Sequence, residues 1–246
     1  MRILLRTVLP VLLVSASAAH AGAQAPPAPP PPPHQTSAEV SFVGTSGNSS
    51  TESIGIGGSR EDHVDGWILT SKAAYIHNSS FGELRAESIA LAFQGNKILT
   101  PKLSVFGKYG FLHDRFAGIE SRNAIGLGLA YIVLENPNNK LTADGSFGYA
   151  QEERTISPTT KSGTWDMGLL YTVKLSDNAE ISDDARMVFS LSDSQDWRGG
   201  NIVSVSAKLN SIFSLKFSNT ARYVNEPVPT FQKTDTITAV ALVAKF

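Results

Sequence analysis

Apolar and polar residues alternate along most of the chain from residue 38 to its end. Between Ala124 and Tyr131, large apolar side chains hold the odd positions, and glycine or alanine holds the even ones. A period of two residues is typical of β-strands whose two faces meet different surroundings. The pattern predicts about twelve strands and no helix. The strands are expected near residues 38–46, 49–60, 65–77, 84–94, 102–115, 121–134, 140–152, 164–175, 180–192, 201–210, 213–225 and 234–246.

An even number of strands of roughly ten residues favours a closed barrel that spans a membrane. In a bilayer every backbone amide must find a partner without water, and closure leaves no strand edge unpaired. The expected connections support this, because the three longest, 153–163, 193–200 and 226–233, all fall at one end. We therefore predict an all-β fold, a transmembrane antiparallel up-and-down β-barrel of about twelve strands. A soluble β-sandwich, in which the same apolar faces form a core, is the alternative.

The other expected connections are short and rich in turn residues. They fall at Glu61-Asp62, at 95–101, at 136–139, at Asp177-Asn178 and at Asn210-Ser211. If the first strand rises from the periplasm, these turns lie on the periplasmic side.

The final run, 234–246, has an apolar face that ends on an aromatic residue at the C-terminus. Val240, Leu242 and Phe246 share this face. A terminal strand of this kind is typical of transmembrane barrels. We interpret these three residues as the C-terminal insertion signal, and we expect the barrel-assembly machinery to be a partner during insertion.

The N-terminus has the organisation of an export signal. Arg2 and Arg6 precede a mostly apolar stretch, and Ala19 and Ala21 are the small residues that a signal peptidase reads. We predict a signal peptide at 1–21, with a retained anchor helix as the alternative. Residues 22–37 follow as a proline-rich periplasmic linker, and the barrel domain occupies 38–246. These boundaries predict that the protein is exported to the bacterial cell outer membrane.

Composition narrows the chemistry. The 246 residues include no cysteine, which excludes disulfides, zinc-thiolate sites and cysteine nucleophiles. Lys plus Arg is 21 and Asp plus Glu is 22; without Arg2 and Arg6 the count is 19 against 22, a net charge near −3. This balance lacks the excess of positive charge that proteins use to bind nucleic acid. We expect no cofactor.

Three stretches carry a family resemblance. They are the Gly47-Asn48 turn with the residues after it, the segment 215–227, and the C-terminal part made of 233–236 and 242–246. Together they resemble the domain-of-unknown-function family 481, often labelled putative salt-induced outer-membrane proteins, over about residues 38 to 246. The resemblance implies a Gram-negative outer-membrane β-barrel with no established enzymatic activity, and it brings no catalytic residues.

Charged side chains are expected on the inward face of the strands. Because both signs occur in a narrow lumen, cross-strand pairs can plug it, or the same charges can line a narrow path for ions. We favour the plugged or very narrow lumen. The proposed lumen charge network contains Lys108, Asp144, Asp166, Lys174, Arg186, Lys216, Arg222 and Asp235. Lys72, Asp184 and Lys208 share the inward parity.

Four glycines, Gly126, Gly128, Gly148 and Gly168, alternate with large outward residues. Crowding in the lumen explains them better than a nucleotide fingerprint, because none of them opens a helix.

Histidines are the only plausible general bases. His77 with Ser79 or Ser80, and His113 with Asp114, fall near the expected outer rim. A barrel lipase or deacylase would place a Ser-His site there. However, no nucleophile motif surrounds these serines. The paired acids Asp183-Asp184 and Glu152-Glu153 should point to opposite faces of their strands, and no metal cluster is evident.

We therefore expect a non-enzymatic outer-membrane barrel that is linked to envelope or osmotic (salt) stress. The alternatives are a narrow pore for ions or small solutes, an outer-leaflet lipid hydrolase, and a soluble carbohydrate-binding sandwich. The expected partners are outer-membrane lipids and lipopolysaccharide, and we expect a monomer.

Overall fold

A computed structural model describes residues 33–47, 51–80, 83–156 and 158–246. They form twelve strands. In chain order these are β1 (His34–Ser46), β2 (Thr51–Val64), β3 (Trp67–Ser80), β4 (Glu83–Ile98), β5 (Leu103–Asp114), β6 (Ile119–Glu135), β7 (Asn139–Arg154), β8 (Thr160–Ser176), β9 (Ala179–Ser190), β10 (Trp197–Lys208), β11 (Phe213–Val224) and β12 (Thr234–Lys245). Among the described residues, no helix has the length and apolar character needed to cross a membrane.

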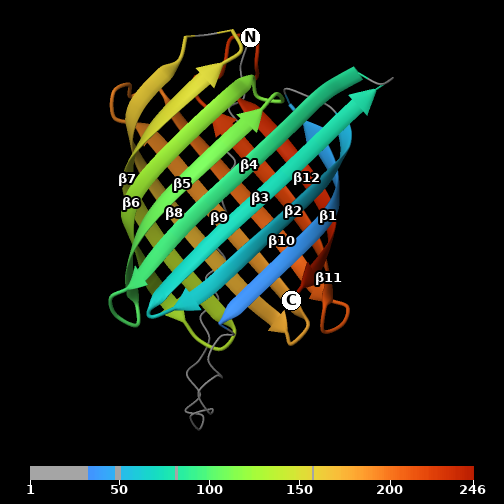
Figure 1. The fold of residues 1–246 in the computed structure, drawn as a ribbon, viewed down its shortest axis with the longest axis vertical. Coiled ribbons are helices and arrows are strands. Elements are labelled where there is room, and N and C mark those ends of the chain that lie inside the picture. Colours follow the sequence, from blue (N-terminus) through green and yellow to red (C-terminus); the bar gives the residue numbers. More distant parts are fainter. Residues whose placement is uncertain (1–32, 48–50, 81–82, 157) are drawn as a thin grey trace, which may run out of the picture. The chain divides into compact units, whose positions relative to one another are not determined.

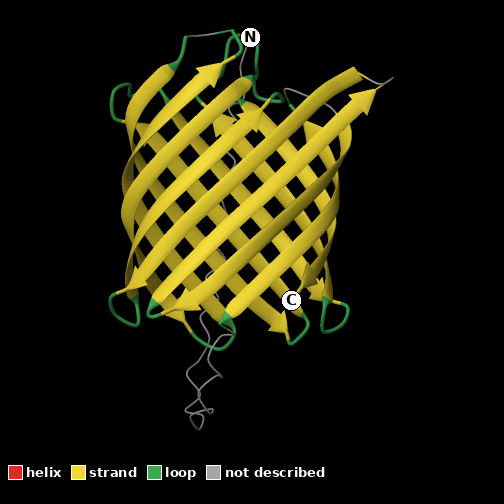
Figure 2. Cartoon of the chain, viewed as in Figure 1, coloured by secondary structure: helices red, strands yellow, loops and turns green. Residues whose placement is uncertain are grey.

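Each strand pairs antiparallel with the strands before and after it in the chain, and β1 pairs with β12 to close the sheet. Figure 1 follows this winding from blue to red, and Figure 2 shows strands and loops, with no helix, in the described part of the chain. Closure leaves no strand with a free edge in the barrel wall. The predicted all-β up-and-down barrel of about twelve strands is therefore confirmed, and the sandwich alternative is wrong.

The barrel closes at the seam between its first and last strands. Their register runs from Ser37 opposite Lys245 to Ser46 opposite Thr236. One residue farther out, the amide of Phe246 donates to the carbonyl of Thr36 at 2.8 Å, and the amide of Thr36 donates back at 3.1 Å. The C-terminal residue thus extends the closing ladder.

Several strands, among them β2, β4 and β7, run farther than their apolar patterns, because charged residues continue them into the rims. The turn expected at Glu61-Asp62 is wrong: β2 continues to Val64, and the turn lies at Asp65-Gly66. Both turn residues have positive φ, 48° and 75°. Asp-Gly is a preferred pair for a two-residue hairpin turn, which requires this left-handed backbone.

The two ends of the barrel differ in their connections. The end that carries the Asp65-Gly66 turn has short turns throughout; we call it the short-turn end, and Figure 1 draws it at the bottom. Asn136 and Asn210 build two of these turns, since each side-chain oxygen accepts backbone amides two and three residues on. The opposite, long-loop end carries the connections 155–159, 191–196 and 225–233.

Large apolar side chains cover the exterior. Phe42 is 74% exposed, Leu127 is 67% exposed and Phe147 is 65% exposed. The buried side chains have the opposite parity, and serine, alanine, aspartate and glutamate are prominent among them. This arrangement inverts the usual soluble fold, in which apolar residues are inside.

The expected signal peptide at 1–21 and most of the expected linker lie outside the described residues. The described chain enters β1 at His34, four residues before the first strand expected from the pattern.

Candidate functional site

Ion pairs between strands that are not neighbours identify the inner face of the barrel. Arg222 on β11 donates from Nη1 to Oδ2 of Asp114 on β5 at 2.9 Å. Five strands separate β5 from β11 in either direction around the sheet. A contact between such distant strands has to cross the interior. On β11 and β5, the residues with the parity of Arg222 and Asp114 therefore face the lumen.

Lys108 on β5 reaches Asp166 on β8, with 2.7 Å between Nζ and Oδ2. The lysine side chain crosses β6 and β7, which lie between these two strands. It passes over Gly126, where a Cβ atom would lie 2.9 Å from Cε of Lys108. Next to it Phe106 is buried over Gly128, where a Cβ would lie 2.8 Å from the ring. Both glycines provide the space for these inward side chains.

Arg186 on β9 holds two carboxylates. Its Nη1 lies 3.5 Å from Oδ1 of Asp144 on β7, and its Nε lies 2.9 Å from Oδ1 of Asp184. Between β7 and β9, Gly168 of β8 lies under the pair; a Cβ there would come within 2.5 Å of the Asp144 oxygen and 3.0 Å of Nη1. The inward glycines thus lie where cross-strand contacts pass over an intervening strand.

Lys216 completes the pairs that involve expected lumen residues. Its Nζ lies 2.8 Å from Oε2 of Glu39, across β12. Asp235 lies with Asp114 and Arg222 around a small hollow near the long-loop end. Lys174 is exposed and has no ion pair within the part of the chain that the structure describes. The structure therefore distributes the expected network over separate pairs along the lumen.

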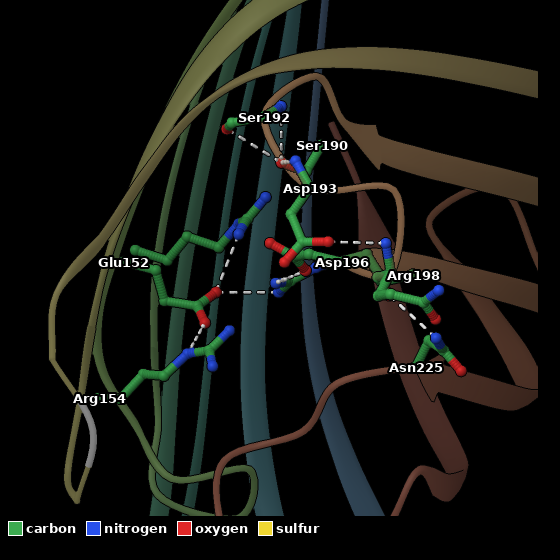
Figure 3. A network of polar contacts seen from close by, with 10 residues as sticks. Glu152, Arg154, Ser190, Ser192, Asp193, Asp196, Arg198 and Asn225 are labelled. Carbon is green, nitrogen blue, oxygen red and sulfur yellow. Dashed lines mark hydrogen bonds and ion pairs between the residues drawn. The ribbon is translucent and has the colours of Figure 1, made fainter.

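A second cluster of charged side chains lies inside the barrel near the long-loop end. Glu152 is its centre, with a side chain that is only 3% exposed. Its Oε2 accepts from Nη1 of Arg122 at 2.8 Å and of Arg198 at 2.9 Å, and its Oε1 accepts from Nε of Arg154 at 2.7 Å. Figure 3 shows these contacts meeting at the single carboxylate. A buried carboxylate is stable here because three guanidinium groups satisfy it.

Two loops are attached to this cluster. Arg198 also lies 3.5 Å from Asp196, at the end of the 191–196 loop, and Asn225 donates to the carbonyl of Gln195 at 2.9 Å (Figure 3). In the 225–233 loop, Val228 is buried, only 3% exposed. The ring of Phe231 fills the space where a Cβ of Gly118 would stand. The long-loop end is therefore narrowed by packed loop residues as well as by charges.

The sequence pattern carried a signal for this cluster that we did not use. Glu152 has the parity of Asp144, and Arg122 has the parity of Gly126. The expected connections 153–163 and 193–200 contain Arg154 and Arg198, so the pattern predicts loops for both arginines. In the structure β7 continues to Arg154 and β10 begins at Trp197, so both arginines lie on strands.

His113 and Asp114 do not form a catalytic pair, because their side chains have different partners. Nδ1 of His113 lies 2.6 Å from the carbonyl oxygen of Glu120, and its Nε2 lies 3.4 Å from Glu87. Asp114 points to the lumen instead. His77 contacts the hydroxyl of Tyr75 at 3.0 Å. The side chains of Ser79 and Ser80 lie outside the described part of the structure.

The paired acids have different partners. Asp184 belongs to the lumen, whereas Asp183 accepts from Nδ2 of Asn201 at 2.6 Å. Glu152 is buried among arginines, whereas Glu153 accepts from the hydroxyl of Ser121 and is exposed. Among the described residues, no group of three or more histidine, aspartate or glutamate side chains could hold a metal ion.

The barrel is similar in fold to solved bacterial outer-membrane barrels. One is the NanC porin, with a TM-score of 0.60 and 7% sequence identity over 85% of this chain and 100% of that one. Another is the translocator domain of the autotransporter NalP from Neisseria meningitidis, with a TM-score of 0.50 and 14% identity over 88% and 90% of the two chains. At these identities the likeness concerns the fold alone. No curated protein sequence matches the chain.

The family described as "Protein of unknown function, DUF481" matches residues 38–246. This range contains nearly the whole barrel, including the C-terminal stretches on which the resemblance rested. The family assignment is therefore confirmed, whereas the link to salt stays a prediction. Since the match covers well over half of the sequence, the chain belongs to the DUF481 family.

Proposed function

We propose that this chain is a non-enzymatic outer-membrane protein that acts as a narrow channel for ions or small hydrophilic solutes. The observation that carries the proposal is the exposure of charged side chains inside the barrel. Arg186 is 46% exposed and Arg222 is 42% exposed, although both face the lumen. Charged groups that face inward and still meet solvent indicate a lumen that holds water, as in barrels with polar interiors.

The exterior supports residence in a membrane. Exposed side chains such as Phe42, Leu127 and Phe147 would be costly to leave in water over so large a surface. In the outer membrane the same surface would contact the acyl chains of phospholipid and lipopolysaccharide. The fold likeness to a protein named as a porin agrees with this reading.

The channel should be narrow. The Glu152 cluster, the Arg222–Asp114 pair and the buried Val228 all occupy the half of the lumen near the long-loop end. Ions can pass such a constriction only around ordered side chains, which lowers conductance. We therefore expect small current steps compared with those of open porins.

Planar-bilayer recording tests the proposal. Purified protein in detergent should first show heat-modifiable gel migration, which identifies a folded membrane barrel. Added to a planar bilayer, the same preparation should produce discrete, voltage-stable steps. Protein that is folded by the gel criterion and yet electrically silent would overturn the channel proposal.

A closed barrel is the second candidate function. The buried Glu152 with its three arginines favours it, since such a cluster can seal one end. A sealed barrel would serve envelope integrity, for example under osmotic or salt stress. Deletion of the gene should then reduce survival after a salt upshift, and complementation should restore survival even when the protein carries no current.

A further inference from the structure

A chamber of about 470 Å³ lies inside the barrel wall formed by β1–β4 and β10–β12. Its charged lining residues are three lysines and one glutamate, Lys72, Lys216, Lys245 and Glu39. Serine side chains share the lining, among them Ser37 and Ser59, whose hydroxyls are 2.8 Å apart. Alanine, leucine, valine and glycine complete the lining, so the lysine and serine hydrogen-bond donors share the chamber with apolar side chains.

Only one of the three lysines has its charge balanced. Nζ of Lys216 lies 2.8 Å from Oε2 of Glu39. Lys72 and Lys245 are exposed, and neither has an ion pair with any residue that the structure describes. One acid against three bases leaves an excess of two positive charges on the lining.

Charged side chains of both signs lie beside the chamber. Lys174 and Lys208 share the inward parity of their strands. Glu180 is the Cα partner of Lys174 and of the lining residue Ser206, and Glu61 has the inward parity of the lining residue Ser59. Deeper in the lumen, Lys108 and Arg186 are already paired with aspartates. Lys72 and Lys245, both exposed, place two ammonium groups without an ion-pair partner among the described residues on the chamber lining itself.

We propose that this chamber is an anion-binding vestibule that makes the channel selective for small anions such as chloride and small carboxylates. Ammonium groups inside a low-dielectric wall focus their field along the water path, which raises the local concentration of anions and excludes cations. The exposed lysines leave room for an anion to reach them. The inference rests on the channel function proposed above and specifies its solute class.

The reversal potential across a potassium chloride gradient measures this selectivity. We expect the sign that corresponds to preferred passage of chloride. Replacing both unpaired lysines, Lys72→Gln with Lys245→Gln, should move the reversal potential toward zero, and Lys72→Glu should move it further. The matched control is Lys161→Gln, because Lys161 on β8 has the parity opposite to that of the buried Thr164 and is exposed.

Citrate provides a second readout, because a multivalent anion held by the lysines should reduce the chloride current. The block should weaken several-fold in the double variant and stay unchanged in Lys161→Gln. Each variant is first checked for heat-modifiable migration, so a folding defect is recognised. Folded protein without current steps would overturn the channel itself. Steps with a preference for potassium, or with equal passage of both ions, would overturn only the vestibule.

Discussion

Arg222 and Asp114 join opposite walls of the barrel through a contact of 2.9 Å between Nη1 and Oδ2. The aspartate is 2% exposed, whereas the arginine is 42% exposed. The pair therefore lies between the packed long-loop end and a part of the lumen in which the Arg222 side chain is exposed. One wall provides a buried acceptor, and the other provides a side chain long enough to reach it.

Breaking this pair should widen the path and weaken the barrel. In Arg222→Ala the buried Asp114 carboxylate loses its cross-lumen partner, which should lower the free energy of unfolding by on the order of 2 kcal/mol. Single-channel conductance should rise, because a long side chain no longer spans the lumen. Urea titration followed by gel migration measures the stability, and planar-bilayer recording measures the conductance.

The double variant Asp114→Asn with Arg222→Ala is the control for that experiment. It removes the buried charge together with its partner, so it should regain part of the lost stability while keeping the larger conductance. Unchanged conductance in both variants would contradict a lumen path past Arg222.

Among the carboxylates of the barrel, Glu152 should cause the largest loss of stability when it is replaced. Glu152→Gln leaves Arg122, Arg154 and Arg198 close together without the negative charge that they share. Losing the charge of a buried group with several partners costs about 3 kcal/mol. Urea unfolding should therefore shift to markedly lower concentration. The neighbour provides the control: Glu153→Gln changes an exposed side chain that accepts a hydrogen bond from Ser121, and it should unfold as the wild type does.

A methyl group at Gly168 should disturb the Arg186–Asp144 contact. Its Cβ would come within 2.5 Å of the Asp144 oxygen, so Gly168→Ala should displace one partner and destabilise the barrel by about 1–3 kcal/mol. Gly107→Ala is the matched control, because a Cβ there meets nothing within 4 Å. Equal unfolding midpoints for the two variants would show that the lumen at Gly168 is roomier than its contacts indicate.

The alternation of residue types was sufficient to predict the barrel and its strand number. It was sufficient because one face of a barrel wall is apolar and the other is polar. Apolar and polar residues must therefore alternate along each strand. The same rule extends to Glu152 and Arg122, which we left out although their parity was readable. Strand ends were harder, since charged residues at a rim resemble turn residues.

Partners could not be predicted from parity. The contact of Arg198 with Glu152 joins β10 to β7, and that of Lys216 with Glu39 joins β11 to β1. Which side chains meet across a lumen depends on the stagger of all the strands between them. The register of each strand pair sets the height of the next strand along the barrel axis. The pattern of a single strand holds no such information.

Two adjacent aspartates on β9 can test which face of the strand meets lipid and which faces the lumen. Asp183 shares the exterior parity of Met187, whereas Asp184 contacts Arg186 in the lumen. A carboxylate on the lipid face is unfavourable, so Asp183→Val should leave stability unchanged or raise it by about 1 kcal/mol. Asp184→Val should lower stability, because it removes a partner of Arg186. Urea unfolding in lipid vesicles compares the two, and the reverse order would mean that the assigned faces are exchanged.

The C-terminal residue should act in two separable ways. Deleting Phe246 removes both backbone hydrogen bonds with Thr36 and also the exposed ring, so we expect weaker seam closure and less barrel in the outer membrane, with export unaffected. Phe246→Leu keeps the backbone bonds and removes only the aromatic ring, so it should fold from urea into detergent as the wild type does. If the ring is also the insertion signal, this variant should still insert poorly in cells. Membrane fractionation with heat-modifiable migration measures both effects, and equal insertion of all three proteins would contradict a role for Phe246 in assembly.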